Sequence, residues 1–371
     1  MKGLKDLRVL FVGTAASGSA SKGRLKALER LGLDGIWSID LSEYLPVVSL
    51  LDKICLRTQI GPKIARFNRE ILNVARLNRI NVLFSDKALS LSPAALHKLR
   101  GMDVFTIDYL IDNPFGPRND PGFRLFKKAL PAFDLHAVQR QSSVKDFKDH
   151  GGREVVTTLV GYDRDLHFPS PIPLTDKDRT RNVSFIGSPY DNRAEFFTSL
   201  CHQNVLLDIS GPRSRWEKAL APEIMKAIFR QGELVGNAYR EGIWKSKINL
   251  CFVTKSNMDE VAQRSYEITA AAAFMLAERT PRHLELFKED EEAIFFSSFE
   301  ECLAKIRQYL PDEAARNRVA AAGHARTTSS GYDHDSILRK ILTKAIELMA
   351  QNKQLPCDSQ AQRVTHTFSA P

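Results

Sequence analysis

The sequence lacks the features of a disulfide-stabilised, membrane-spanning or disordered protein. Its five cysteines never form a Cys-x-x-Cys pair, so neither a disulfide scaffold nor a cysteine-built zinc site is expected. No apolar run approaches the roughly 18 residues that a membrane helix needs, and the run at 9–12 is too short for a signal peptide. With 43% hydrophobic and 26% charged residues, the composition is that of a globular protein. We therefore expect a folded, cytoplasmic chain with reduced thiols.

Positive charge is concentrated in the first half of the chain. Residues 1–170 hold 26 Lys and Arg against 18 Asp and Glu, while the formal net charge of the whole chain is +9. The basic helix expected near 61–79 could face an anionic or glycan acceptor or an acidic membrane surface, or could simply be a solvated helix face. Peripheral contact at the inner membrane face is one such alternative. Aromatic residues do not alternate with the cations, so nucleic acid is not an expected partner.

The length of 371 residues exceeds what one hydrophobic core holds and predicts two domains. Apolar strands alternate with helices in both halves, which is typical of parallel sheets buried on both faces. A proline-rich, charged stretch separates the halves and is interpreted as the linker. The expected division is an N-terminal domain at 1–165, a linker at 166–182, a C-terminal domain at 183–348 and a disordered tail at 349–371.

An ordered series of segments in the second half resembles a known family. The segments, spread over about 180–340, are KINLCFV, RSYEITAAAAFMLAE, LFKEDEEAIFF, CLAKIRQYL and RNRVAAAGHART. Together they resemble the group 1 glycosyltransferases of the spore-maturation (CgeB-type) family, a branch of the GT-B enzymes similar to glycosyltransferase family 4. The first half matches more loosely, through VLFSDK, IDYLID and FDLHAVQR.

The resemblance implies an α/β protein of the GT-B fold, with two Rossmann-like domains whose parallel sheets face each other across a cleft. A nucleotide-sugar donor would bind mainly to the C-terminal domain and an acceptor to the N-terminal one. The resemblance also implies retention of anomeric configuration, and it implies neither a cofactor nor a metal. Two alternatives stay open: a GT-B epimerase or phosphorylase, and a catalytically silent protein that uses the fold to bind a ligand.

Several candidate site residues lie in the motif RSYEITA and just before it. By resemblance, Glu267 is the carboxylate that holds the donor ribose, and Tyr266 beside it joins the donor-binding set. Arg264 lies on nearly the same helix face as Glu267, so it could bind a phosphate or pair with Glu260. Asp259, eight positions before Glu267, stands where family 4 has a second acid and is a catalytic candidate. An exposed helix glutamate is the plainer interpretation of Glu267.

Three further candidates open the second domain, and one ends a strand of the first. In FIGSPYDNR, Gly187 and Ser188 could present backbone N–H groups to a diphosphate and Arg193 could neutralise it. An ordinary strand-to-helix turn would look the same. Asp112 matches an aspartate of the family and is the second catalytic candidate, with capping of the next loop as its alternative role.

One departure from the family lies where the key helix ends. The family usually has glycine before the following strand, but this chain has Ala272. Because alanine resists the left-handed conformation of such a position, the turn is expected to be built differently.

Overall fold

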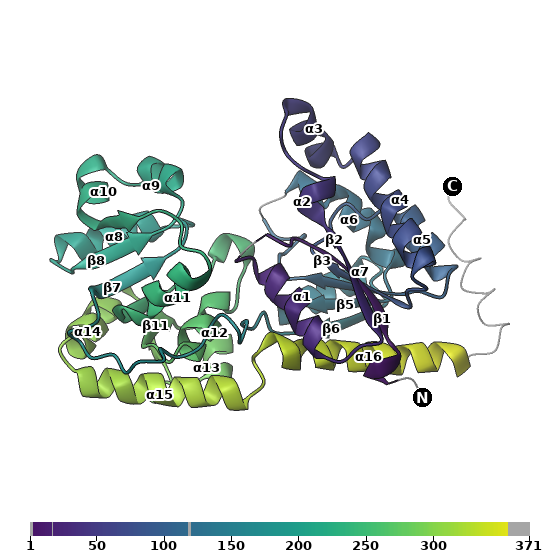
Figure 1. Ribbon diagram of the computed structural model, residues 1–371. Coiled ribbons are helices and arrows are strands. Elements are labelled where there is room, and N and C mark those ends of the chain that lie inside the picture. The colour runs from purple at the N-terminus through teal and green to yellow at the C-terminus, as the bar shows by residue number, and fades with distance from the viewer. Residues whose placement is uncertain (1–2, 17, 118–119, 355–371) are drawn as a thin grey trace.

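The computed structural model describes residues 3–16, 18–117 and 120–354, which form two α/β domains side by side (Figure 1). Each domain is built on a parallel sheet of six strands. The first sheet has the order β2-β1-β3-β4-β5-β6, with β1 (Arg8–Gly13), β2 (Gly35–Asp40), β3 (Val82–Asp86), β4 (Phe105–Leu110), β5 (Leu135–Val138) and β6 (Glu154–Thr157). The second has the order β12-β11-β10-β7-β8-β9, with β7 (Arg181–Ile186), β8 (Leu207–Ser210), β9 (Phe229–Gln231), β10 (Ser246–Cys251), β11 (Met275–Glu278) and β12 (Ile294–Phe296).

The order of strands reverses beside the first strand of each sheet. In the first sheet β1 lies between β2 and β3, and in the second β7 lies between β10 and β8. The connections leave such a strand on opposite sides, so a crevice opens outside its carboxyl end, where open parallel sheets bind ligands. A ligand site is therefore expected near the chain after Gly13 or near the chain after Ile186.

Helices cover both faces of the first sheet, which explains its apolar strands. One face packs against α4 and α5, and the other against α1 and the last helix of the chain. The helices of this part are α1 (Ala20–Arg30), α2 (Leu41–Tyr44), α3 (Leu50–Thr58), α4 (Pro62–Leu77), α5 (Pro93–Arg100), α6 (Arg124–Ala129) and α7 (Gln141–Asp149), with short 3-10 turns η1 (Leu4–Asp6), η2 (Pro121–Phe123) and η3 (Leu130–Ala132).

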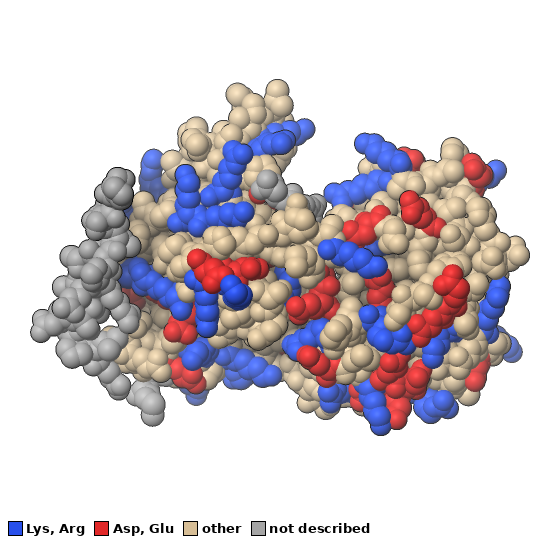
Figure 2. All heavy atoms as spheres, turned by 180° about the vertical axis from the view of Figure 1, so that it is seen from behind, with Lys and Arg blue, Asp and Glu red and all other residues tan. Residues whose placement is uncertain are grey.

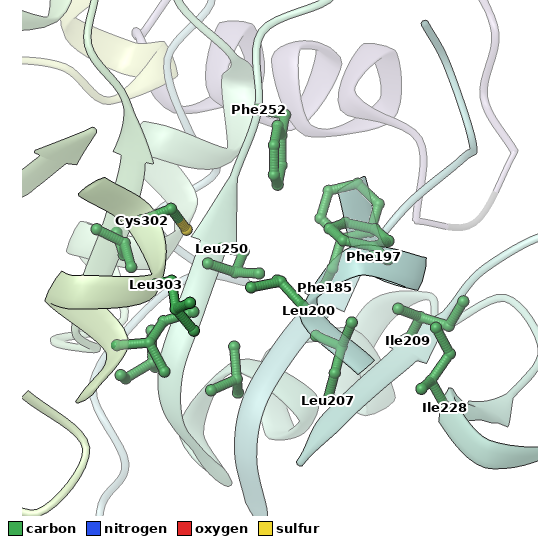
Figure 3. Packing of buried hydrophobic residues seen from close by; sticks show 14 of the residues in the cluster. Phe185, Phe197, Leu200, Leu207, Ile209, Ile228, Leu250, Phe252, Cys302 and Leu303 are labelled. Carbon is green, nitrogen blue, oxygen red and sulfur yellow. The ribbon is translucent and has the colours of Figure 1, made fainter. Parts of the chain in front are cut away.

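The second sheet is likewise covered on both faces. On one face Phe185 of β7 packs against Phe197 of α8, with ring centroids 5.0 Å apart, and Leu250 and Phe252 lie beside them (Figure 3). The helices that follow β7 along the chain are α8 (Arg193–His202), α9 (Arg213–Ala219), α10 (Pro222–Ile228), α11 (Gly236–Trp244), η4 (Lys255–Asn257), α12 (Gln263–Ala270), α13 (Pro281–Leu286), α14 (Phe299–Tyr309), α15 (Glu313–Ser329) and α16 (His334–Gln354). None of the helices in the described part is long and apolar enough to cross a membrane.

The last helix, α16, returns to the first domain. Its apolar face, which includes Ile337, Leu338 and Leu342, is buried in the same core as α1 and β1. The second domain was expected to extend to residue 348, but α16 completes the core of the first domain instead. Figure 1 shows α16 running beneath the first domain. Of the tail expected to be disordered, 349–354 continue this helix and 355–371 lie outside the described residues.

The expectation of an altered turn after α12 is wrong. Ala272 takes the left-handed conformation with φ of 50° despite its Cβ. Its N–H donates to the carbonyl of Thr269 over 3.0 Å, and the N–H of Ala273 donates to that of Ile268 over 3.1 Å. These two bonds form the Schellman motif that glycine usually ends. The turn thus has the shape that glycine usually forms, and it carries the conformational cost of a Cβ.

Candidate functional site

A cavity of about 470 Å³ lies between the two domains, at the strand-order reversal of the second sheet. Residues 18–20 of the first domain and 163–167 of the crossing segment form one side. The other side is formed by the chain after β7, the start of α11, the chain after β10 and the start of α12. The stretch expected as a plain linker at 166–182 therefore contributes Leu166 and His167 to the cavity wall.

Five of the eight candidate residues line this cavity: Ser188, Arg193, Asp259, Arg264 and Glu267. The other three do not. Gly187 lies directly behind Arg264, Tyr266 is fully buried in the core, and Asp112 forms an ion pair with Lys87.

Two arginine side chains bring positive charge to the cavity. Arg193 is the first residue of α8 and is 3% exposed. The guanidinium carbons of Arg193 and Arg264 lie 5.5 Å and 5.6 Å from the centroid of the Phe185 ring. Burial, and next the charge of Arg264, lower the pKa of Arg193. Burial alone would lower the pKa of Arg264, but Tyr239 and Glu267 outweigh it and raise that pKa.

Neither arginine forms an ion pair with a carboxylate of the described residues. Arg193 donates instead to backbone carbonyls, at 3.2 Å to Ser188 and 3.0 Å to Val253, and to the Thr254 hydroxyl at 3.2 Å. The Nε atoms of Arg193 and Arg264 are buried and have no hydrogen-bond partner among the described residues. One buried and one half-buried cation that form no ion pair within the described residues make the cavity a place where an anion is favourable.

Gly187 allows Arg264 to approach the strand end. A Cβ built on Gly187 would lie 3.0 Å from Nη2 of Arg264 and 2.9 Å from the Phe185 ring. The Gly187 N–H donates to the carbonyl of Ser210 over 2.8 Å, and its carbonyl accepts from Trp216 over 2.8 Å. Because both backbone groups are occupied, Gly187 serves the site by its lack of a side chain.

Glu267 projects from α12 and is 8% exposed at the cavity wall. Its Oε2 accepts a short hydrogen bond from the phenol of Tyr239 on α11, and its Oε1 accepts from Nε2 of Gln263 over 2.8 Å. Nε2 of His167 lies 3.8 Å from Oε1. Burial, followed by the charge of Glu267, raises the pKa of Tyr239 well above its ordinary value, so the phenol remains a donor. Each carboxylate oxygen keeps a lone pair for a ligand hydroxyl.

Tyr266 and its neighbour Ser265 face the core of the domain. The ring of Tyr266 packs against that of Tyr332 with centroids 5.5 Å apart, and its side chain does not reach the cavity. Ser265 bonds to Nε2 of His283 over 2.7 Å, a pair that the sequence did not predict. Nδ1 of His283 bonds to the backbone carbonyl of Glu278, and both side chains are fully buried. Without access or an acid, this pair does not form a hydrolase triad.

Asp259 joins the two domains at the edge of the cavity. Its Oδ1 accepts from Arg140 of the first domain and from Asn257 over 2.9 Å. Arg140 is fully buried and also donates to the carbonyls of Met258, over 2.9 Å, and Ile111, over 2.8 Å. Burial raises the pKa of Asp259 more than the nearby guanidinium lowers it.

The residues of the cavity wall that sequence reasoning missed include Tyr239, His167 and His334. His334 is fully buried, and this burial lowers its pKa well below the ordinary value. These residues come from a helix, the crossing segment and the start of α16. No local pattern marks them, because only the assembly of the two domains brings them together.

Comparisons with known proteins agree with this architecture. Residues 193–343 match the family model described as "Glycosyl transferase-like", and no curated protein sequence matches the chain. Among solved structures, sucrose-phosphate synthase from Thermosynechococcus elongatus is similar with a TM-score of 0.68 and 11% identity, covering 93% of this chain and 100% of that one. HepE from Anabaena in complex with UDP gives 0.59 and 12%, covering 92% and 100%. The structure of "Trehalose-6-phosphate from E. coli bound with UDP-2-fluoro glucose" gives 0.63 and 13%, covering 94% and 99%. The chain therefore has the GT-B fold, and its second domain is similar to the glycosyl transferase-like family.

Proposed function

We propose that this protein is a glycosyltransferase that binds a nucleotide-sugar in the cavity between its domains. The observation that carries the proposal is the pair of guanidinium groups at the cavity wall, buried Arg193 and half-buried Arg264, which form no ion pair with a carboxylate of the described residues. Arg193 follows β7 on α8, and Arg264 reaches the end of β7 from α12, next to Gly187. Both therefore lie outside the carboxyl end of the first strand of the second sheet, a position that suits a diphosphate. HepE, a structural neighbour, has been solved with UDP and with UDP-glucose, which supports this choice of ligand.

In the proposed complex each side chain has one task. The two guanidinium groups hold the diphosphate and stabilise its growing charge as the glycosidic bond breaks. Glu267, oriented by Tyr239 and Gln263, accepts hydrogen bonds from the ribose hydroxyls. Oδ2 of Asp259, which accepts no hydrogen bond from the described residues, faces the donor sugar. Residues 18–20 of the first domain, which form one side of the cavity, exclude water that would otherwise hydrolyse the donor.

The acceptor would enter from the first domain, near the carboxyl ends of β3 and β4. Asp112 follows β4 and pairs with Lys87, which follows β3. We propose that Asp112 acts on the acceptor hydroxyl, as the family resemblance suggests. Retention of anomeric configuration and membership of the CgeB-type branch rest on the same resemblance. Identifying the anomer of the product by nuclear magnetic resonance would test retention.

Binding of UDP and of uridine separates the role of the arginines from general effects. The variant Arg264→Met should lower affinity for UDP by roughly ten- to a hundredfold, because hydrogen bonds between charged groups are worth about 1.5–3 kcal/mol. Affinity for uridine, which has no phosphate, should change by less than about twofold. Arg213→Met is the matched control, since Arg213 is exposed on α9 and pairs with Glu217 away from the cavity. Equal loss for UDP and uridine would contradict the assignment.

Turnover distinguishes a transferase from other proteins with this fold. Release of UDP from a nucleotide-sugar that depends on an added acceptor supports transfer. Conversion of the sugar without an acceptor would identify an epimerase, and tight binding without turnover would identify a binding protein. We propose that donor binding needs no metal, because two arginines offer the charge that a cation would supply. Loss of UDP affinity in excess chelator, restored by magnesium or manganese, would contradict this.

A further inference from the structure

The segment 47–60, which contains α3, exposes its apolar side chains. Six of the thirteen strongly exposed large hydrophobic residues in the described structure lie within these fourteen positions. They form what we call the α3 patch: Val47, Val48, Leu50, Leu51, Ile54 and Ile60. Leu51 is 72% exposed and Val48 is 83% exposed. Soluble surfaces rarely collect apolar side chains in this way unless they meet a partner or a membrane.

The side of α3 that faces the protein is polar. Asp52, only 5% exposed, accepts from the backbone N–H groups of Val48 and Ser49 and pairs with Lys63 of α4. Gln59, 7% exposed, accepts from the hydroxyl of Ser90 over 2.7 Å. The segment therefore turns an acid and an amide inward and Leu50 and Leu51 outward, which is the reverse of an ordinary surface helix. Polar bonds hold α3 in this orientation.

Cations surround the α3 patch. Lys53 and Arg57 lie exposed on α3 itself, and Arg66 and Arg69 lie exposed on the neighbouring α4. Over 47–70 the only acids are Asp52, which is paired with Lys63, and Glu70. Figure 1 shows α3 projecting from the end of the first domain, and Figure 2 shows tan surface at that end with blue side chains beside it.

We propose that the α3 patch docks on an anionic membrane surface, with its apolar side chains between the lipids and its cations at the headgroups. Exposed aliphatic side chains combined with a ring of Lys and Arg fit such a surface. A second copy of the chain fits less well, because pairing two α3 patches would bring their cations together. The segment 355–371 fits less well too, since it has one acid, Asp358, and only Leu355, Val364 and Phe368 as large apolar residues.

The experiment is sedimentation of the full chain with lipid vesicles. We expect binding to vesicles that contain phosphatidylglycerol, little binding to pure phosphatidylcholine, and weakening as salt rises. Leu51→Glu should lower the affinity by about tenfold or more, because it removes one leucine that would insert between the lipids and adds a charge that the anionic headgroups repel. Leu77→Glu is the matched control, because Leu77 is 76% exposed on α4 outside the α3 patch and receives the same change of charge.

The cations are tested by Lys53→Gln and Arg57→Gln. Each should weaken binding to the anionic vesicles by about fivefold, which corresponds to about 1 kcal/mol for one cation near the surface. Unchanged UDP affinity and circular dichroism would show that the variants are folded. The proposal is overturned if the wild-type chain does not bind anionic vesicles at low salt, or if Leu51→Glu and Leu77→Glu lose equal affinity. It is also overturned if the wild-type chain forms a dimer and binds no vesicles, and Leu51→Glu dissociates that dimer.

Discussion

Removal of Arg140 is expected to be the most damaging single change at the contact between the domains. Its guanidinium has no exposed surface and joins Asp259 to the carbonyls of Met258 and Ile111. The variant Arg140→Met keeps much of the volume but leaves the Asp259 carboxylate, 16% exposed, without its counter-charge. Loss of one partner from a buried ion pair costs about 3–5 kcal/mol. We expect the free energy of unfolding at neutral pH to fall by about that amount.

The pH dependence of this variant gives a second, independent readout. Burial already raises the pKa of Asp259 above its ordinary value, and loss of the guanidinium removes the main opposing influence. A carboxyl group with a raised pKa in the folded state costs stability as pH rises above the pKa of the unfolded chain. The deficit of Arg140→Met should therefore be small at about pH 4 and grow toward neutral pH.

Urea unfolding of four variants measures the effect. Asp259→Asn should restore most of the stability lost in Arg140→Met, because the double variant has no unpaired carboxylate. Lys145→Met on α7 is the control, since the ion pair of Lys145 with Asp149 is exposed and should contribute less than about 1 kcal/mol. A loss below about 1 kcal/mol for Arg140→Met, or no recovery in the double variant, would refute the role of this pair.

Three further predictions concern the second domain. Ala272→Gly should raise the free energy of unfolding by up to about 1 kcal/mol, because glycine relieves the left-handed strain but adds entropy to the unfolded chain; urea unfolding that shows a clear loss would contradict this. Glu267→Gln should lower affinity for a ribonucleotide by about tenfold or more, and the loss should nearly vanish with a 2′-deoxyribonucleotide, which lacks the same contact. If calorimetry shows that the two losses add fully, Glu267 does not hold the ribose. Burial lowers the pKa of His283 to about 4 and keeps it neutral in the fold, so stability should fall as pH drops from about 6.5 to about 4, by about 3 kcal/mol from this group. His283→Gln should flatten that part of the stability curve, and an unchanged slope would exclude the assignment.

Local patterns in the sequence determined the elements that surround the site. The apolar run RVLFVG forms the buried strand β1, and GIWSID forms the edge strand β2. Ser92, a residue type that favours helix N-caps, caps α5 with its hydroxyl, which accepts from the N–H of Ala95. The spacing of Arg264 and Glu267 places both on one helix face, and both line the cavity.

Tertiary structure alone decided which side chains meet. Arg140 and Asp259 are 119 positions apart, and Tyr239 reaches Glu267 from another helix. No sequence pattern predicted that α16 would cross to the first domain or that α3 would turn its leucines outward. Residue periodicity predicts the polar and apolar faces of a helix. Which of these faces is buried depends on the side chains that other segments place against the helix. The inward side of α3 is decided by Lys63 and Ser90, which satisfy a buried acid and a buried amide.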